Sequence, residues 1–336
     1  MVQSSQNILN LVKIEDKNVI TGKDLKKMFL KAFEDFKETF EIVDRINVFP
    51  VPDGDTGLNI LETLRAIKCE LDTLNENCTI SSVIRKIAYG SFNGSVGNSG
   101  IILSEYLHGL EIIWQNFDKI NLEILKLGFQ KATEFAYKCM SNPKEGTILT
   151  IQRRISEYTN NIDSSITNPY EALFFSFIES KKALIETHYI LHEINKAKTI
   201  DAGALAFVLI LESIISSVFD NDIFLLTSRT LNSEIKPFLK VDFEELVIEQ
   251  EWEVIFTIDS IKKSVDLIKN ALKKEGECLI ITHDHEYADY KVHIHIKKPL
   301  NEFLNKLKQI FGEISNIRFT DLKTQSEDFL ELIIKD

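Results

Sequence analysis

Glycine is concentrated in one part of this chain. The sequence has 13 glycines among its 336 residues, and seven of them lie in a single stretch of the first third. They are Gly54, Gly57, Gly90, Gly94, Gly97, Gly100 and Gly109. Because there are only six prolines as well, turn-forming residues are too few for a turn-rich β-sandwich. Long helices are favoured, with backbone freedom confined to the glycine-rich stretch.

The first 220 or so residues carry a helical pattern of apolar side chains. In 24–46 they recur every three or four residues, and Thr21 with Asp24 resembles a capping box at the start. Further helices are expected at 58–74, 80–91, 98–117, 121–140, 147–160, 169–187 and 203–219. We therefore expect a helical domain over 1–219. Residues 220–250, with many charges and Pro237, are interpreted as a connector.

The periodicity changes after residue 250. Strand patterns at 253–258, 277–282, 290–296 and 314–322 alternate with helical stripes at 260–274 and 300–311. The order β-α-β-β-α-β is that of a ferredoxin-like α+β sandwich, which we expect for 251–336. Residues 329–334 are interpreted as one more strand. Two domains agree with the length of the chain, at about 100 to 200 residues per domain.

Composition and charge disfavour several classes of partner. The 39 basic and 51 acidic residues give a net charge of −12 without a polybasic run, so nucleic acid and anionic membrane surfaces are poor partners. The most apolar segment, 204–219, contains Glu212 and is too short to span a bilayer, so no integral membrane segment is expected. Without a signal-peptide pattern or a CxxC pair, we expect a cytoplasmic protein.

The acidic segment, NVFPVPDGDTGLN at 47–59, is the first candidate for chemistry. On its own, Pro-Asp-Gly is typical of a surface turn. Asp53 and Asp55, however, lie two residues apart with Thr56 and Asn59 close behind, so several oxygen ligands can converge on a hard cation such as Mg²⁺. The flanking residues are apolar, which is unusual for a solvated turn.

The glycine-rich segment, GSFNGSVGNSG at 90–100, is the second candidate. Its glycines let the backbone approach an anion, Asn98 and Ser99 can donate hydrogen bonds, and the following helix adds the positive end of its dipole. A flexible connection between helices is the alternative, and the P-loop and Rossmann patterns are absent. Mg²⁺ would reconcile a triphosphate with the acidic segment, as in phosphoryl transfer.

Four blocks of sequence, in this order, resemble the kinase domain of the DAK2 family. They are NVFPVPDGDTGLN, GSVGNSGIILSEYLHG, EGTILTIQRR and IDAGALAFVLILE. The family includes the ATP-binding subunits of dihydroxyacetone kinases and of bacterial fatty acid kinase, and the FPVPDGDTG form is closer to the fatty acid kinase branch. The resemblance implies a barrel of eight antiparallel helices that binds ATP and two Mg²⁺ ions at one end.

The resemblance also implies roles for single residues. Asp53 and Asp55, with Asn47, would hold Mg²⁺. Phosphate contacts would come from Thr56, Asn59, Gly97, Asn98, Ser99 and Gly100, and the nucleotide site would include Thr147, Asp201 and Gly203. The family commonly has an arginine before GNSG, where this chain has Val96. Arg153 is expected to compensate as a catalytic cation.

Residues 277–325 resemble the middle domain that follows the kinase domain in fatty acid kinase. His293 and His295 would share one face of a strand, and the resemblance suggests a zinc site there, with Glu253 at the position of the usual cysteine. Strand histidines without a metal are the alternative. Fatty acid kinases continue into a further domain associated with the fatty-acid-binding partner protein, and we expect that domain to be absent.

The leading hypothesis is an ATP- and Mg²⁺-dependent kinase that forms acyl phosphate from a fatty acid presented by a carrier protein. A carboxylate is ionised at pH 7 and needs no general base. The alternatives are a kinase for dihydroxyacetone or another small hydroxyl compound, and a catalytically weak nucleotide-binding regulator or scaffold. The oligomeric state stays open, with a homodimer as one arrangement.

Overall fold

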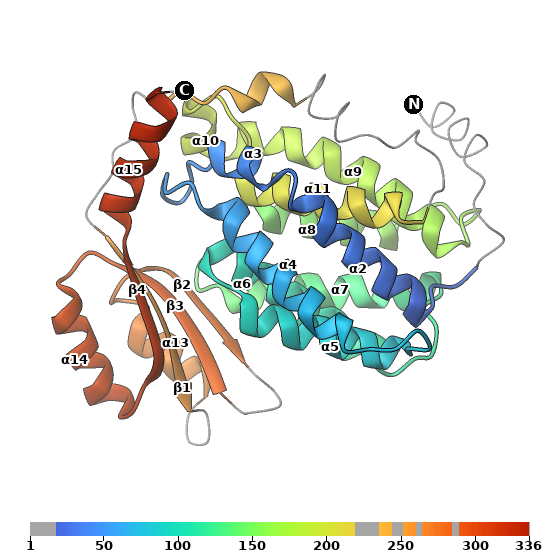
Figure 1. Cartoon of the computed structure of the whole chain (residues 1–336), viewed down its shortest axis with the longest axis horizontal. Coiled ribbons are helices and arrows are strands. Elements are labelled where there is room, and N and C mark those ends of the chain that lie inside the picture. Colours follow the sequence, from blue (N-terminus) through green and yellow to red (C-terminus); the bar gives the residue numbers. More distant parts are fainter. Residues whose placement is uncertain (1–17, 219–234, 244–250, 260–263, 284–288, 336) are drawn as a thin grey trace.

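The computed structural model describes residues 18–218, 235–243, 251–259, 264–283 and 289–335 (Figure 1). The helices of its first part, called the helical unit, are α2 (Gly22–Phe36), α3 (Phe40–Arg45), α4 (Thr56–Asp72), α5 (Ile80–Gly94), α6 (Gly97–Trp114), α7 (Leu122–Cys139), α8 (Ile148–Asn160), α9 (Pro169–Ile190), α10 (His192–Lys196) and α11 (Ala202–Ser216). The predicted helical character of this part is confirmed. Of the predicted connector 220–250, only 235–243 is among the described residues, and it contains the 3-10 helix η2 (Lys236–Leu239).

Side-chain caps begin most helices of this unit where the sequence has Thr, Asn or Asp. Thr21 and Asp24 form the expected capping box of α2, and Thr79 and Ser82 form another at α5. The other side-chain caps are Asn121 for α7, Thr147 for α8, Asn168 for α9 and Asp201 for α11. These bonds satisfy amides that the first helical turn leaves without an internal partner.

The single helix expected over 24–46 is two helices, α2 and α3. They are separated by a turn in which the Thr39 hydroxyl donates to the carbonyl oxygens of Phe36 over 3.3 Å and Asp35 over 3.4 Å. Such local side-chain bonds compete with the helical pattern of the backbone. The second helix carries Asp44 to the start of α4.

Helix α11 is the buried helix predicted from the apolar segment. It packs against α2, α8 and α9, and its side chains are buried along most of its length. Its one charged residue, Glu212, is buried too, and burial raises the pKa of this carboxyl to about 7. No helix in the described part of the chain is both long and apolar enough to cross a membrane.

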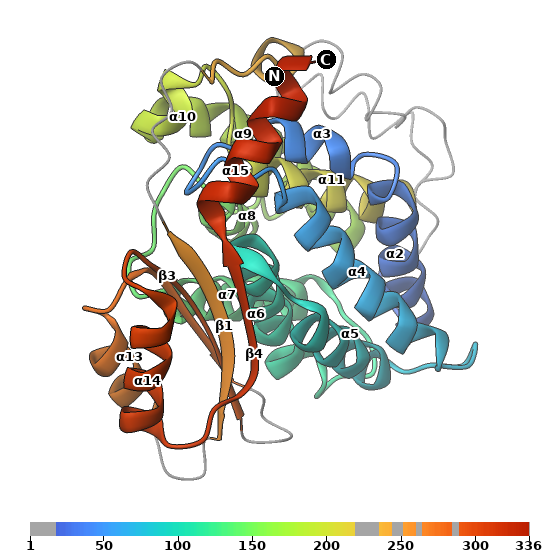
Figure 2. The same ribbon diagram turned by 60° about the vertical axis from the view of Figure 1, so that its left-hand side comes forward.

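The second part, called the sheet unit, follows the predicted order β-α-β-β-α-β. Its elements are β1 (Trp252–Asp259), α13 (Val265–Leu272), β2 (Glu277–His283), β3 (Asp289–Ile296), α14 (Leu300–Phe311), β4 (Ser315–Asp321) and a further helix, α15 (Leu322–Lys335). The strands pair antiparallel in the order β2-β3-β1-β4. Helices α13 and α14 cover one face of the sheet, and the helical unit lies on the other side (Figure 2).

The extra strand expected at 329–334 is wrong, because these residues lie in α15. A short apolar run does not distinguish a strand from a helix by periodicity alone. In α15 the apolar residues are divided between two environments. Leu322 is buried and Phe329 packs on Phe243, with 5.9 Å between ring centres, whereas Leu332 is 65% exposed.

Strand β3 sorts its side chains onto two faces. Its apolar residues, Tyr290, Val292, Ile294 and Ile296, belong to the core beneath α13 and α14. Lys291, His293 and His295 alternate with them and share the opposite face. Lys291 contacts Ser95, and His295 lines a cavity with residues of the acidic segment. This face of the strand therefore meets the helical unit.

Several contacts hold the sheet unit against the helical unit. Met140 and Ile280 form an isolated β-bridge. The Lys269 ammonium of α13 donates to the Lys138 carbonyl over 2.6 Å, close to the last residue of α7. Lys291 makes an equivalent bond near the end of α5. The unpaired carbonyls at helix ends are natural acceptors for lysine.

Candidate functional site

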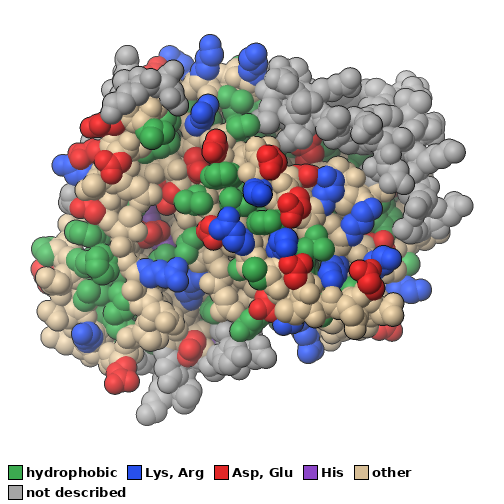
Figure 3. Space-filling model, in the orientation of Figure 1, with side chains coloured by type: hydrophobic (Ala, Val, Ile, Leu, Met, Phe, Trp, Pro, Cys, Tyr) green, Lys and Arg blue, Asp and Glu red, His purple; other side chains and the backbone are tan. Residues whose placement is uncertain are grey.

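The acidic and glycine-rich segments meet in one cavity beside the sheet unit. The residues lining it are Asn47, Pro50, Asp53, Asp55, Thr56, Asn59, Gly97, Asn98, Ser99, Glu253 and His295. The structure thus brings together the predicted Mg²⁺ ligands, most of the predicted phosphate contacts and part of the predicted zinc group. On the molecular surface, a histidine and acidic side chains lie beside each other where the two units meet (Figure 3).

Hydrogen bonds within the acidic segment hold the two aspartates. Asn47 Nδ2 donates to Asp53 Oδ1, and the Thr56 hydroxyl donates to Asn47 Oδ1. Asn59 Nδ2 donates to Asp55 Oδ1 over 2.8 Å. A carboxylate has about four lone-pair sites, so these bonds orient both groups and leave acceptor capacity for a cation.

Helix α15 closes over the same segment. Gln325 Nε2 donates to Asp55 Oδ2 over 3.0 Å and to the Asp53 carbonyl oxygen over 3.3 Å. Between the aspartates, Gly54 has a φ of +67°, and a Cβ on it would lie 2.1 Å from the Phe329 ring. Only glycine satisfies both the left-handed backbone and the close ring.

Asp44 of α3 caps α4 in place of that helix's own N-cap residue. Its Oδ1 accepts from the Gly57 N–H over 2.6 Å and from the Leu58 N–H over 3.2 Å. Asp55 stands at the N-cap position and makes no side-chain cap bond. Because Asp44 satisfies these amides, the Asp55 carboxylate is available to the cavity.

Burial raises the pKa of the carboxyl groups around the cavity, and neighbouring carboxylates add to the effect at Asp53 and Glu253. Burial raises the pKa of Asp53 well above its usual value, and the charges of Asp55 and Glu253 add to the effect. Burial also raises the pKa of Asp55, and burial with the Asp55 charge raises that of Glu253 to about 7. A divalent cation would remove the cost of charging these groups together. A hard, anionic oxygen donor set fits Mg²⁺.

The start of α6 faces this cavity without a side-chain cap. Gly97 has a φ of +62°, a left-handed conformation that favours glycine, and a Cβ there would lie 2.3 Å from Asn59 Nδ2. Asn98 Oδ1 is buried and, within the described residues, has no hydrogen-bond partner. Open amides at a helix N-terminus favour an anion.

The neighbouring glycines serve helix packing. A Cβ on Gly94 would lie 2.3 Å from the Ala66 Cβ, and one on Gly100 would lie 3.0 Å from Thr63 Oγ1. Both positions let α5 and α6 approach α4. Of the glycines at 94, 97 and 100, the cavity wall contains Gly97 alone.

The other residues predicted for the nucleotide lie at the starts of α8 and α11. Thr147 and Asp201 each accept a hydrogen bond from a backbone amide in the first turn of their helix. Burial raises the pKa of Asp201 to about 7. A Cβ on Gly203 would lie 2.9 Å from Ser99 Oγ, so α11 begins against the first turn of α6. These residues lie beside the cavity and outside its wall.

Arg153, the predicted catalytic cation, is held away from this group. Its Nη2 donates to Glu145 Oε2 over 3.0 Å, and its Nη1 donates to Glu157 Oε1 over 2.8 Å. It does not line the cavity. The structure therefore does not bring Arg153 to the aspartates, and contact with a phosphate would require release from Glu145.

Glu253, His293 and His295 form a group of potential metal ligands next to the aspartates. One ligand atom from each lies within 4.8 Å of the others. Both ring nitrogens of His293 are buried and lack a hydrogen-bond partner in the described structure. Burial lowers the pKa of His293 well below its usual value, which favours the neutral, metal-binding imidazole. Two imidazoles and a carboxylate fit Zn²⁺.

His295, in contrast to His293, has a raised pKa, which favours its protonated form. Burial alone would lower its pKa, but the contacts with Cys278 and Glu251 raise the pKa of His295 to about 10. Its Nδ1 lies 3.7 Å from Glu251 Oε2. Because a metal needs the unprotonated ring nitrogen, ligation by His295 would release a proton.

Comparison with known proteins identifies the family. A model of the DAK2 domain matches residues 50–216, and a model of the FakA-like middle domain of fatty acid kinase matches residues 249–329. The chain belongs to the DAK2 family. The second match adds the middle domain to this DAK2 chain, in agreement with the resemblance seen in the sequence.

Relatives and a solved structure align with the DAK2 chain at low identity. Uncharacterized proteins of Staphylococcus haemolyticus (strain JCSC1435) and Staphylococcus aureus (strain USA300) are each 25% identical, over 329 and 328 residues. Each alignment covers 93% of this chain and 57% of the relative, so the chain spans little more than half of their length. The dihydroxyacetone kinase from C. freundii, in complex with AMP-PNP and Mg²⁺, aligns with a TM-score of 0.42 and 14% identity over 61% of this chain and 35% of its own.

Residues around the site that were not predicted from the sequence include Asp44, Lys291 and Cys278. Asp44 lies on a helix and gives no local sign that it caps another one. Lys291 could have been found, because it continues the alternation of His293 and His295 by one step. Cys278 contacts His295 at an irregularity in the pairing of β2 with β3, which periodicity does not reveal.

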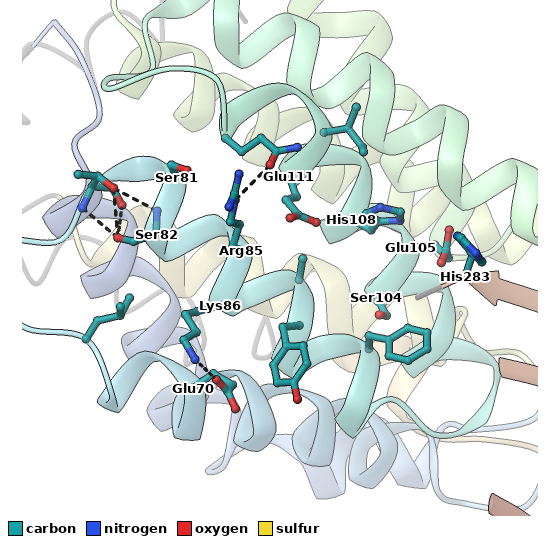
Figure 4. A pocket seen from close by; sticks show the side chains of 17 residues that line it. Glu70, Ser81, Ser82, Arg85, Lys86, Ser104, Glu105, His108, Glu111 and His283 are labelled. Atoms are coloured by element: carbon teal, nitrogen blue, oxygen red, sulfur yellow. Dashed lines mark hydrogen bonds and ion pairs between the residues drawn. The ribbon is translucent and has the colours of Figure 1, made fainter. Parts of the chain in front are cut away.

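A larger cavity of about 940 Å³ lies along α5 and α6. Figure 4 shows Arg85 and Lys86 toward one end, and Glu105 beside His283 at the other. Burial raises the pKa of Glu105 to about 8, against the opposing effect of a hydrogen bond from the His283 backbone amide. The lining carries both charges and none of the predicted site residues, so it indicates no ligand class.

Proposed function

We propose that this DAK2 chain is an ATP- and Mg²⁺-dependent kinase of the fatty acid kinase type. One observation carries the proposal: Asp53 and Asp55 share a cavity with the uncapped start of α6. The aspartates repel a polyphosphate and the open amides attract it. A divalent cation bound to both aspartates and phosphate removes this conflict.

In this proposal the cation ligands are Asp53, Asp55 and Asn47. Phosphate contacts come from Thr56, Asn59, Gly97, Asn98, Ser99 and Gly100, and Thr147, Asp201 and Gly203 complete the nucleotide site. When bound, Mg²⁺ neutralises phosphate charge and supplies electrostatic stabilisation during transfer. The chain's part is to fix the carboxylates through Asn59 and Gln325 and to aim the first amides of α6 at the phosphates.

The proposed acceptor is the carboxylate of a fatty acid presented by a fatty-acid-carrying binding protein. The match to the FakA-like middle domain of fatty acid kinase supports this choice. The acceptor oxygen forms a bond to the γ-phosphorus while the bond from that phosphorus to the β-phosphate bridging oxygen breaks, which gives acyl phosphate and ADP. Because the carboxylate is ionised at pH 7, no proton has to be removed.

A small hydroxyl compound such as dihydroxyacetone is the second candidate acceptor. It is favoured by Glu253 when that residue binds no metal, because Glu253 lines the cavity and its pKa is raised to about 7. A carboxylate with this pKa is suited to remove a proton from a hydroxyl group near neutral pH.

We further propose that Glu253, His293 and His295 hold Zn²⁺, with the unpartnered nitrogens of His293 as supporting observation. For the architecture, we propose an eight-helix antiparallel barrel over 1–219 and a ferredoxin-like sandwich over 251–336, joined by 220–250. The strand order β2-β3-β1-β4 supports the second assignment.

The test combines the purified full chain with ATP, Mg²⁺ and a fatty-acid-loaded carrier protein. Acyl phosphate reacts with hydroxylamine to give a hydroxamate, whereas the phosphate ester of a hydroxyl acceptor does not. A hydroxamate signal that disappears in Asp53→Asn supports the carboxylate kinase, and a hydroxylamine-stable product from dihydroxyacetone supports the second candidate. Tight ADP binding without either product points to a nucleotide-binding regulator.

A further inference from the structure

Lys291 of β3 reaches across to the turn that precedes α6. Its ammonium donates to the Phe92 carbonyl over 3.0 Å, to the Ser95 hydroxyl oxygen over 3.0 Å and to the Ser95 carbonyl. It also lies 5.7 Å from the centre of the Phe92 ring. Phe92 and Ser95 are at the C-terminal end of α5, where carbonyls lack helical partners and carry partial negative charge. One side chain of the sheet unit thus holds this end of the helix.

The same turn leads directly into the start of α6, to which the proposed function assigns phosphate binding. Ser95 is followed by Val96, the N-cap residue of α6, and by Gly97 in the cavity wall. The Val96 side chain cannot cap the helix, so no local side-chain bond fixes the first amides of α6. The direction of these amides therefore depends on the peptide group between Ser95 and Val96, whose carbonyl oxygen Lys291 binds.

We propose that Lys291 is a positioning residue that holds the turn at 95–97 in the conformation that binds nucleotide phosphates. This inference rests on the proposed function and adds a requirement to it. Lys291 and His295 share one face of β3, and the first holds the glycine-rich segment while the second lines the cavity with the acidic segment. The glycine-rich segment and the acidic segment therefore both lie beside the same strand of the sheet unit.

Lys269 provides a matched control for this role. It also belongs to the sheet unit, and its ammonium donates to the Lys138 carbonyl over 2.6 Å at the end of α7. Lys269→Met therefore removes a lysine contact with a helix end between the same two units. The residues it contacts do not line the Asp53 cavity. A merely structural loss should look alike in both lysine variants.

The experiment measures the dissociation constants of ATP with Mg²⁺ and of AMP by calorimetry on the full chain. Lys291→Met is expected to weaken ATP–Mg²⁺ binding about tenfold, as for buried carbonyl groups left without their hydrogen-bond donor, and AMP binding much less. Lys291→Arg should recover part of the loss. Lys269→Met should leave the ratio of the two constants unchanged. Hydrogen exchange of 95–100 without nucleotide should be faster in Lys291→Met than in Lys269→Met.

The outcomes separate this inference from the proposed function. If the wild type binds ATP–Mg²⁺ and Lys291→Met keeps the wild-type ratio of constants, the positioning role is overturned and the proposed function stands. Equal losses in the two methionine variants, or loss of AMP and ATP in parallel, also overturn it. If the wild type binds no nucleotide, both proposals fail.

Discussion

The side-chain amide of Gln325 donates a hydrogen bond to Asp55 Oδ2 across 3.0 Å and so joins α15 to the acidic segment. Gln325→Leu leaves this carboxylate oxygen without that donor. Loss of a hydrogen bond to a charged group costs about 1.5–3 kcal/mol, so the free energy of unfolding should be lower by about this amount in Gln325→Leu than in the wild type. Urea denaturation measures this difference.

The surface residue Gln130 supplies the control for Gln325. Its Nε2 donates to Asn160 Oδ1 over 2.8 Å, and both groups are exposed to solvent. Gln130→Leu should change stability by no more than about 0.5 kcal/mol. Equal losses of stability in the two leucine variants would show that the hydrogen bond to Asp55 contributes no more to stability than an exposed one.

Removing one charge from the aspartate pair should separate stability from binding. Asp53→Asn keeps an oxygen for the bond from Asn47 and relieves repulsion with Asp55 and Glu253. We expect melting without metal to occur a few degrees higher and ATP–Mg²⁺ binding to weaken at least tenfold. Scanning calorimetry and titration calorimetry measure the two effects.

Asp163→Asn serves as the control, because this exposed carboxylate accepts a bond from the Ser165 amide in a surface turn. Asp163→Asn should change neither the melting temperature without metal nor the affinity for ATP–Mg²⁺. Unchanged ATP–Mg²⁺ affinity in Asp53→Asn would reject the assignment of Asp53 to the cation.

The histidine group makes a prediction about metal content. The purified protein should contain about one zinc per chain, and His293→Ala should lose it, because that residue supplies the unpartnered nitrogens. His283→Ala changes a histidine outside the group and should retain the metal. Mass spectrometry of metals in the three proteins decides the question, and equal zinc content in all of them would remove His293 as a ligand.

Glu105 predicts a component of the pH dependence of stability. Burial raises its pKa in the folded chain from the ordinary 4.5 to about 8, so between these values the folded state holds a proton that the unfolded state releases. Below about pH 4.5 Glu105 is protonated in both states and leaves the free energy of unfolding unchanged. As the pH rises from there toward 8, Glu105 lowers the free energy of unfolding by at most about 1.4 kcal/mol per pH unit.

Glu105→Gln should therefore make the unfolding free energy decline less steeply across this pH range. Denaturant titrations at several pH values measure the slope. Glu111→Gln, on the same helix and lining the same cavity, is the comparison. Identical slopes for the wild type and Glu105→Gln would mean that Glu105 is ionised in the folded chain.

The helices and the acidic segment were predictable because their signals are local. Thr21 and Asp24 indicate a capping box within four residues, and the two aspartates of the acidic segment are separated by a single glycine. The contact between Lys291 and Ser95 joins segments far apart in the chain, and no pattern within either segment contains it.

Arg153 is a residue whose sequence position predicted a contact that the structure does not contain. Its position in a sequence block suggested a role at the phosphates, but Glu145 in the same block pairs with its guanidinium. Which of two nearby charges a flexible side chain meets depends on packing in three dimensions, and the sequence alone does not determine it.

The contact between Gly54 and Phe329 has an evolutionary consequence. A left-handed backbone restricts position 54 to glycine or occasionally asparagine, and the ring against it removes the space that even asparagine would need. Replacement of Phe329 by a small residue is therefore the step that would open position 54 to change. Across related sequences positions 54 and 329 should therefore covary, because a side chain of α15 near the end of the chain restricts the residue allowed in a loop near its beginning.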